Sequence, residues 1–362
     1  MRSRLVSLML FPLVLAGAVR AESEAYFAGI SPDAEMVLIA DLESLLASPL
    51  VQQVQMMVQQ FSPSENPKAL AMGLTEYTGA TTDDLGKVVL SASNVQLLQS
   101  IEDPSMVSKK QIEETGVMLT FQLNKSIPAD KFQEWVNNVT PPAELAKTKK
   151  TQVGKGDLYE TEGDTGMAMG FLPSDTQTLI YVGGEAGVKS ALKTGEGELP
   201  KDLVTAESLA ASLPNLAVLA SPSKEWKEQL VASAEANMEG EDDTIFIKEA
   251  QQFLFGLNIS DGLDILSAIK FANEEIANEA YTALSESITE FKATPLEPGP
   301  MMLAAPLLNA MNVTESGDSV TFSTGLNAQQ AQGILAMLPM LIMSQMQQGM
   351  GPMGPGAAPT AP

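Results

Sequence analysis

The stretches AEMVLIADLESLL (residues 34–46) and PNLAVLASPSKEW (residues 214–226) read as the same pair of elements. Each begins with a short run of β-type residues and then passes into a pattern that is typical of a helix. The two stretches share little identity, so the likeness lies in the order of elements. We therefore expect the chain to contain one strand-and-helix arrangement twice.

A second pair of stretches repeats this likeness further along the chain. VMLTFQLNKSIPADKFQEWV (117–136) and LDILSAIKFANEEIANEAYTAL (263–284) each read as a strand followed by a helix. Glycine-containing turns, such as Asp261-Gly262, separate neighbouring apolar runs and predict β-hairpins. Both halves of the chain therefore combine hairpins with helical connections.

Strands that are joined partly by hairpins and partly by helices build an antiparallel sheet that carries helices. We predict an α+β fold of two tandem ferredoxin-like-type units, with antiparallel sheets and helices packed on one face. The first unit covers residues 22–196 and the second covers 205–347, with a junction around 196–205. Within the second unit we expect a helix over about 245–255 and a last apolar helix over about 327–347.

Short motifs mark the first unit: DA (33–34), DL (41–42), SPL (48–50) and TGATTDDLGKVVLS (78–91). With the order of elements, these motifs resemble a loose group of secreted bacterial proteins of unknown function that have two tandem α+β repeats. The resemblance covers most of the chain. Its motifs are short and apolar, so they are packing signatures. The resemblance implies the fold and export, and it supplies no catalytic residues.

Residues 1–21, MRSRLVSLMLFPLVLAGAVRA, read as a removable export leader. Arg2 and Arg4 give a positive start, residues 5–15 are apolar, and small residues precede a cleavage position after Ala21. This pattern predicts a Sec-type signal peptide. We therefore expect a secreted or periplasmic protein.

One further apolar segment, ILAMLPMLIM (334–343), could be considered for a membrane. It has ten residues and contains Pro339, whereas a membrane-spanning helix needs about 20 apolar residues. We therefore expect no membrane span after the leader is cleaved. The tail 348–362 is rich in Met, Gly and Pro and is expected to be disordered.

The chain after residue 21 has no histidine, cysteine or arginine. The absence of histidine removes the usual acid–base group at neutral pH, and the absence of cysteine removes thiol chemistry. Zinc sites built from Cys and His are excluded as well. The absence of arginine removes the bidentate guanidinium group that recognises phosphate or carboxylate.

The charge of the chain after residue 21 is strongly negative. Its 18 lysines face 45 acidic residues, which gives a net charge of −27. Proteins bind nucleic acids by neutralising phosphates with Lys and Arg, so we expect no nucleic-acid partner. Anionic lipid surfaces are disfavoured for the same reason.

Two features of the sequence bear on a hydrolase function. Residues 221–224, 64–66 and 193–195 match the S-x-x-K, S-x-N and K-T-G motifs of penicillin-binding enzymes, but their order along the chain differs from the order in those enzymes. A carboxylate-dependent hydrolase needs two acids about 5–10 Å apart, and 45 acidic residues carry no signal for one particular pair. Trp135 and Trp226 are the two tryptophans available to stack on a sugar.

Three patterns raise the question of bound ligands. The acidic run 239–243 could hold Ca²⁺ but does not match the 12-residue calcium loop. Residues 183–187 (GGEAG) lack the Lys-Ser/Thr of a phosphate-binding loop. Methionine thioethers at the following positions could bind Cu(I), although such a spacing also forms an ordinary apolar helix face. These positions are Met337, Met340, Met343, Met346, Met350 and Met353.

These observations favour an exported, acidic, non-enzymatic binding, scaffold or assembly module. Its partner would be an unknown protein or a second copy of the chain, contacted through the C-terminal apolar helix. A carboxylate-dependent hydrolase and a Met-based Cu(I)-handling protein remain as alternatives. No catalytic, cofactor-binding or metal-binding residue is assigned, and no cofactor is expected.

Overall fold

The computed structural model describes residues 27–53, 78–99, 108–139, 142–162, 167–197, 200, 203, 215–237, 245–293, 301–334 and 336. Several expectations from the sequence lie outside these residues: the leader, most of the junction 196–205, the acidic run 239–243, the six methionines and the tail 348–362.

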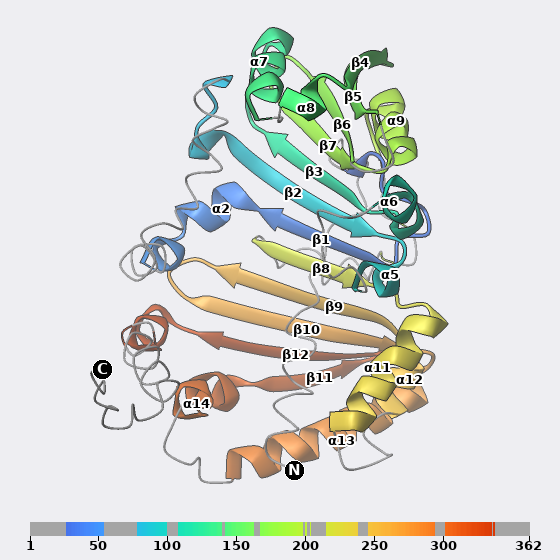
Figure 1. The fold of residues 1–362 in the computed structure, drawn as a ribbon. Coiled ribbons are helices and arrows are strands. Elements are labelled where there is room, and N and C mark those ends of the chain that lie inside the picture. Colours follow the sequence, from blue (N-terminus) through green and yellow to red (C-terminus); the bar gives the residue numbers. More distant parts are fainter. Residues whose placement is uncertain are drawn as a thin grey trace, which may run out of the picture.

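All the strands of the described chain belong to one sheet (Figure 1). In chain order they are β1 (Met36–Asp41), β2 (Leu85–Ala92), β3 (Met118–Leu123), β4 (Thr148–Val153), β5 (Gly156–Thr161), β6 (Ala168–Pro173), β7 (Thr178–Gly183), β8 (Leu216–Ala220), β9 (Ala250–Ile259), β10 (Leu263–Phe271), β11 (Asn312–Ser316) and β12 (Ser319–Leu326).

Along the chain, the helices occur between these strands. They are α2 (Leu42–Ala47), η3 (Thr82–Asp84), α5 (Val95–Gln99), α6 (Lys109–Thr115), α7 (Ala129–Val139), α8 (Pro142–Leu145), α9 (Glu185–Thr194), α11 (Lys224–Asn237), α12 (Ile245–Glu249), α13 (Glu274–Ala293) and α14 (Met301–Ala310). No helix among the described residues is both long enough and apolar enough to cross a membrane.

The expectation of an antiparallel sheet with helices is confirmed. The expectation of separate sheets is wrong, because the twelve strands form one sheet in the order β11-β12-β10-β9-β8-β1-β2-β3-β7-β6-β5-β4. The two stretches quoted first supply β1 and β8, which are neighbours near the middle of this order. Their pairing joins what we expected to be two units.

The seam between β1 and β8 is antiparallel and is centred on Leu38 opposite Val218. Met36 pairs with Ala220 on one side of this centre, and Ala40 pairs with Leu216 on the other. Each strand also pairs on its other edge, β1 with β2 and β8 with β9. Both strands are therefore interior strands, which explains why their sequences are apolar almost throughout.

Helices cover both faces of the sheet, so the expectation of helices on one face is wrong. On β7, Ile180 packs with Phe132 of α7, whereas the adjacent Tyr181 packs with Val188 of α9. Because successive side chains of a strand point to opposite faces, α7 and α9 lie on opposite sides. We call these sides the α7 face and the α9 face.

The α7 face can be followed from strand to strand by the register. The register pairs at successive junctions link Ile180 of β7 to Leu38 and Val218 at the seam, and these in turn to Phe322 and Val313 on the last two strands. Phe322 and Val313 pack in the same apolar cluster as the buried side of α13. The long helix α13 therefore covers the same face as α7.

One element of the second half differs from the expected pattern. The run 245–255, expected as a helix, is split into the short helix α12 and the first part of β9, which begins at Ala250. Leu254 and Phe255 are buried, and β9 pairs with β8 and β10 on its two sides. A short apolar run has the same appearance in a buried helix and in an interior strand, so its periodicity did not decide between them.

Candidate functional site

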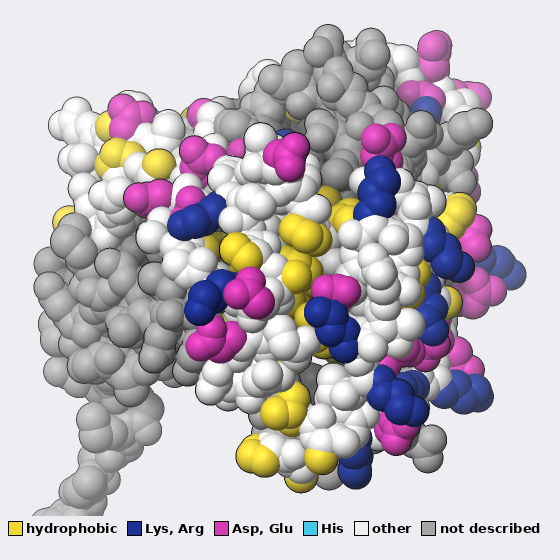
Figure 2. All heavy atoms as spheres, turned by 90° about the horizontal axis from the view of Figure 1, so that it is seen from above, with side chains coloured by type: hydrophobic (Ala, Val, Ile, Leu, Met, Phe, Trp, Pro, Cys, Tyr) yellow, Lys and Arg dark blue, Asp and Glu magenta, His cyan; other side chains and the backbone are white. Residues whose placement is uncertain are grey.

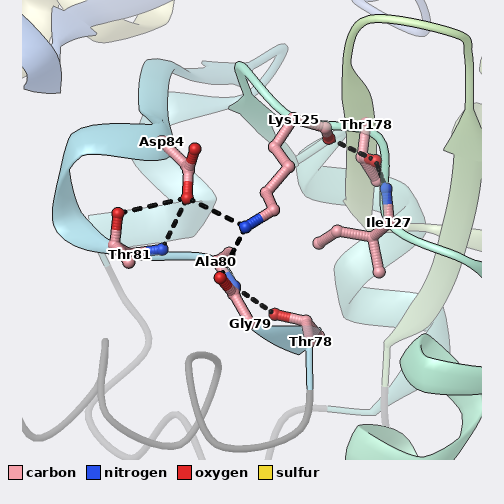
Figure 3. Close-up of polar contacts among 8 residues, drawn as sticks. All are labelled: Thr78, Gly79, Ala80, Thr81, Asp84, Lys125, Ile127 and Thr178. Carbon is pink, nitrogen blue, oxygen red and sulfur yellow. Dashed lines mark hydrogen bonds and ion pairs between the residues drawn. The ribbon is translucent and has the colours of Figure 1, made fainter.

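A polar cluster connects the ends of β2, β3 and β7 (Figure 3). Thr78, Gly79 and Thr81 lie in the segment that leads through η3 into β2. Lys125 lies in the loop that follows β3, and Thr178 is the first residue of β7. The cluster includes part of the TGATTDD motif and joins three segments that are far apart in the sequence.

The carboxylate of Asp84 is the centre of this cluster. Its Oδ2 accepts hydrogen bonds from the backbone N–H of Thr81 at 2.7 Å and from the Thr81 hydroxyl at 3.1 Å. The Nζ of Lys125 lies 3.5 Å from the same oxygen and donates to the carbonyl of Gly79 at 2.6 Å. The lysine thus contacts both ends of the turn 78–84, at the Gly79 carbonyl and at the Asp84 carboxylate.

The backbone explains why the turn takes this shape. Gly79 has φ of +69°, in the left-handed region that side chains with a Cβ rarely adopt. The Asp84 side chain accepts a hydrogen bond from the Thr81 N–H and so closes the turn at η3, as acidic side chains commonly do. The sequence Thr-Gly-x-Thr-x-x-Asp therefore encodes the turn locally.

The loop that carries Lys125 is fixed by the buried hydroxyl of Thr178. This hydroxyl donates to the carbonyl of Lys125 at 2.8 Å and accepts from the N–H of Ile127 at 2.8 Å. Thr178 is fully buried, so loss of these bonds would leave two backbone groups unpaired. The strand β7 thereby sets the position of the lysine.

The electrostatics of the cluster favour structure over catalysis. The pKa of Asp84 is lowered, first by the hydrogen bond from the Thr81 backbone and, to a smaller degree, by the Thr81 hydroxyl and the Lys125 ammonium, against the effect of burial. A carboxylate with a lowered pKa is a weak proton acceptor at neutral pH. The Thr81 hydroxyl therefore gains little activation from it, and the cluster acts as a clasp.

A second group of polar contacts locks the two halves together at one end of the seam. The Ser48 hydroxyl donates to the carbonyl of Ser260 at 2.6 Å, and the Asn215 side-chain oxygen accepts from the N–H of Ile259. The N–H of Asp41 donates to the Asn215 carbonyl at 2.8 Å. Ser48 and Asn215 are buried, so these bonds are partly shielded from water.

The other end of the seam is held by Glu35. Its carbonyl accepts from the N–H of Ser221 at 2.8 Å, and its carboxylate accepts from the N–H of Val95 at the start of α5 at 3.1 Å. Glu35 thus bonds both to the residue that follows β8 and to the first residue of α5. Both ends of the seam are therefore fixed by specific hydrogen bonds as well as by the strand ladder.

A third polar group is buried on the α9 face. The hydroxyls of Ser91 and Thr120 have no hydrogen-bond partner among the described residues, and both side chains are fully buried. Tyr181 lies opposite Thr120, and burial raises the pKa of its phenol. A phenol whose pKa is raised by burial stays protonated at neutral pH, so it is a poor nucleophile.

The residues of the penicillin-binding motifs have local structural roles. In the run 221–224, the Ser223 hydroxyl accepts from the N–H of Trp226 at the start of α11. The Lys224 ammonium faces Glu228 on the exposed side of the helix at 3.5 Å. The run 193–195 ends α9, where Gly195 is the left-handed C-cap. The third motif, 64–66, lies outside the described residues.

The other patterns are also accounted for where the structure describes them. Gly184 is the N-cap of α9, and the Glu113 carboxylate accepts from the N–H of Ala186 at 3.1 Å. A carboxylate therefore occupies the place where a phosphate would have to bind. No group of three or more metal-binding side chains occurs within the described part of the chain.

Among the described carboxyl groups, the shifts that are resolved all lower the pKa. They occur at Asp84, at Glu162 beside Lys149, and at Glu185 beside Lys189. A hydrolase that uses two carboxyl groups needs one of them to stay protonated near neutral pH, which requires a raised pKa. These three residues do not suit that role.

Sequence reasoning did not find Lys125 as the partner of the TGATTDD motif. The motif was recognised, but its partner lies 41 residues beyond Asp84 and in a different loop. A lysine within NKSIPAD has no local feature that links it to a turn so far away. The lysine and the turn meet because β2 and β3 are adjacent strands.

Comparison with known proteins identifies no family for this chain. Neither the family models nor the curated proteins match the chain. A solved structure described as crystal form I of TP0453 matches 88% of this chain and 99% of that chain, with 10% sequence identity and a TM-score of 0.42. A likeness of this size does not establish a shared fold and carries no argument about function.

Proposed function

We propose that the chain is an exported, non-enzymatic module for binding, scaffolding or assembly. The observation that carries this proposal is how the described polar clusters are used: they clasp loops and close the seam of one continuous sheet. The Lys125–Asp84 cluster and the Ser48–Asn215 contacts bond within the chain, so they are not free to act on a substrate. An extended sheet held in this way offers surfaces rather than a reaction centre.

Export follows from the leader at 1–21, which has a positive start, an apolar middle and a small-residue cleavage position. The protein would then act in the periplasm or outside the cell. A net charge of −27 after residue 21 suits this role, because it keeps the chain soluble and away from nucleic acids and anionic lipids.

The module would consist of two related units, 22–196 and 205–347, fused at the β1–β8 seam. Two features support this division. The strand orders outward from the seam begin β1-β2-β3-β7-β6 and β8-β9-β10-β12-β11, which are equivalent in connection. The seam register is symmetric about Leu38 and Val218, as expected when two equivalent strands pair.

The contact surface would include the C-terminal segment that follows the described chain. Residues 337–347 are apolar and rich in methionine, which adapts to varied partners. The beginning of this segment is anchored, because Asn327 caps the helical turn in which Ala331 is buried. Its partner would be another exported protein or a second copy.

The experiment is to compare the mature protein with a variant that ends at Ala336 and so retains the anchored turn. Light scattering would give the mass, and co-purification from the native exported fraction would give the partners. We expect the truncation to remove a partner or lower the mass. Unchanged mass and unchanged partners would contradict the proposed contact, and rapid turnover of a substrate without added cofactor would contradict the proposed function.

A further inference from the structure

The sheet ends in two strands that pair on one side only among the described residues. These are β4, which pairs with β5, and β11, which pairs with β12. Most of the side chains of β4 are exposed, and alternate side chains of β11 are exposed. An unpaired edge presents a row of backbone N–H and C=O groups that can pair with another strand.

We propose that copies of this chain associate head to tail, with β4 of one copy pairing with β11 of the next. The strand count gives the geometric reason. Neighbouring strands are antiparallel at every junction of the twelve-stranded sheet. Because twelve is even, β4 and β11 run in opposite directions, so a copy set beside the first in the same orientation continues the antiparallel alternation.

The same placement also keeps each face of the sheet continuous. Lys150 lies opposite Tyr159, which contacts Phe132 of α7, so Lys150 is on the α7 face. Glu315 lies opposite Val320 in the cluster under α13 and accepts from Asn278 of that helix at 3.1 Å, so it is on the same face. Helices of successive copies would then line one side of a longer sheet.

One register pairs opposite charges between the copies. If Lys150 lies opposite Glu315, then Thr151 lies opposite Thr314, and Lys149 lies opposite Ser316. Opposite charges and facing threonines are favourable cross-strand pairs. In this register, side chains on the α7 face of one edge lie opposite side chains on the α7 face of the other edge.

The distribution of charge favours joining unlike ends. Residues 108–197, which form the β4 end, hold 10 lysines and 12 acidic residues, whereas residues 215–362 hold 5 lysines and 18 acidic residues. Figure 2 views the β4 end and shows lysine and carboxylate side chains intermixed around small apolar patches. Two β11 ends would join regions that are both strongly acidic, and two β4 ends would bring lysines together. Head-to-tail contact avoids both repulsions.

Existing ion pairs do not prevent this contact. Lys149 faces Glu162, and Lys150 lies 2.9 Å from Asp157, with these side chains largely or partly exposed. Exposed pairs of this kind contribute little to stability and can be rearranged. Lysines on an edge strand ordinarily discourage pairing with a neutral edge, so they would select an edge that carries a carboxylate.

Head-to-tail contact between identical copies does not close on itself unless the rotation between copies forms a ring. The expected product is therefore a series of oligomers whose average mass grows with concentration. This inference rests on the proposed function and names a second copy as one partner. It uses the sheet edges and is independent of the C-terminal segment.

Sedimentation velocity of the mature protein tests this inference, over concentrations up to about 1 mM. We expect the weight-average mass to rise beyond that of a dimer. Lys150→Glu and Glu315→Lys should each weaken association by about tenfold, because each places like charges opposite one another. The double variant with both changes should restore it. The matched control is Lys110→Glu with Glu114→Lys, an exposed pair on α6 away from both edges, which should change nothing.

A protein that stays monomeric at every concentration, stops at a closed dimer, or is not restored by the double variant would overturn the proposal. The variant that ends at Ala336 separates this failure from failure of the proposed function. If truncation removes a partner while the edge variants behave like wild type, the binding module stands and the edge contact does not. If the edge variants act as expected in the truncated chain too, the edges alone carry the self-association.

Discussion

Counted outward from the seam, the two halves of the sheet begin with the same strand order and then diverge. In each half a helix follows the third strand, α7 after β3 and α13 after β10, and both helices cover the α7 face. The first half then adds the hairpin β4–β5 and the helix α9, which covers the opposite face of that hairpin. The second half ends its described sheet at β11.

The additional hairpin changes how the equivalent helices pack. Phe132 of α7 stacks on Phe171 at 4.1 Å between ring centroids and meets Tyr159 of the added strand β5 edge-on at 5.7 Å. In α13 the buried positions are aliphatic and lie along one side of the helix: Ala277, Ala280, Leu284 and Ile288. The short helix α7 therefore packs on the wider part of the sheet through aromatic side chains, whereas the long helix α13 packs on the narrower part through Ala, Leu and Ile.

The largest effect should come from emptying these two helix interfaces. Phe132→Ala should destabilise the protein by about 3–5 kcal/mol and Leu284→Ala by about 2–5 kcal/mol, because each leaves a cavity. The chain has one tryptophan on each side of the seam, Trp135 and Trp226, so each half can be followed separately in single-tryptophan variants by urea denaturation.

If the seam makes the halves one cooperative unit, each substitution should lower the midpoint reported by both tryptophans equally. Trp135→Phe and Trp226→Phe alone serve as the reference proteins. Separate transitions, with each substitution felt by one tryptophan, would show that the halves unfold independently despite the shared sheet.

The hairpin turns of the two halves provide a matched pair of glycines. Gly154 and Gly317 both have positive φ, of 59° and 61°. A Cβ on Gly154 would lie 2.4 Å from the carbonyl oxygen of Leu192 in α9, whereas the nearest atom to one on Gly317 is the Glu274 carboxylate at 3.8 Å. The helix α9 thus leaves no room for a side chain at Gly154 in the β4–β5 turn.

Gly317→Ala should therefore cost about 1–2 kcal/mol, the cost of the left-handed conformation alone. Gly154→Ala should cost about 1–3 kcal/mol more, because α9 has to move. Thermal unfolding of the two variants measures the difference. Equal losses would mean that α9 does not press on the β4–β5 turn.

Much of this arrangement could be predicted from the sequence. The hairpin at Asp261-Gly262, the strand 216–220 and the helix 224–237 follow from turn chemistry and periodicity, which are local properties. The pairing of β1 with β8 could not, because it joins residues about 180 positions apart and each strand alone reads as a core strand. Periodicity identifies an element but not its partner.

The placement of helices on both faces left a signal that could have been used. The runs LAVLA of β8 and TLIYVG of β7 are apolar without alternation, and nearly all of their side chains are buried. Continuous apolar strands are typical of sheets covered on both sides. By contrast, the clasp at Lys125 had no such signal, because its partners come together only after β2 and β3 pair.

The seam bonds should contribute less than the core. Asn215→Ala removes the acceptor for the partly buried N–H of Ile259 and should cost about 1–3 kcal/mol. Ser48→Ala removes the donor to the Ser260 carbonyl and should cost about 1 kcal/mol, since a carbonyl loses one of two possible bonds. Urea denaturation followed at Trp135 and at Trp226 should show both halves weakened together. A loss seen in one half alone would mean that the bond supports its own half and not the seam.

The smallest effect concerns the clasp at Asp84, compared with the ion pair of Lys270 and Asp318 in the other half. Because the folded-state pKa of Asp84 is lowered, its carboxylate stabilises the fold above the unfolded pKa of about 3.9, and this contribution is lost as the pH falls through the folded pKa. Asp84→Asn should therefore cost up to about 1 kcal/mol at neutral pH and nothing at low pH, as measured by urea midpoints across the range. Asp318→Asn, which replaces a more exposed carboxylate at 3.6 Å, should cost less at neutral pH. A loss at Asp84 that persists unchanged at low pH would show that the turn depends on the shape of the side chain and not on its charge.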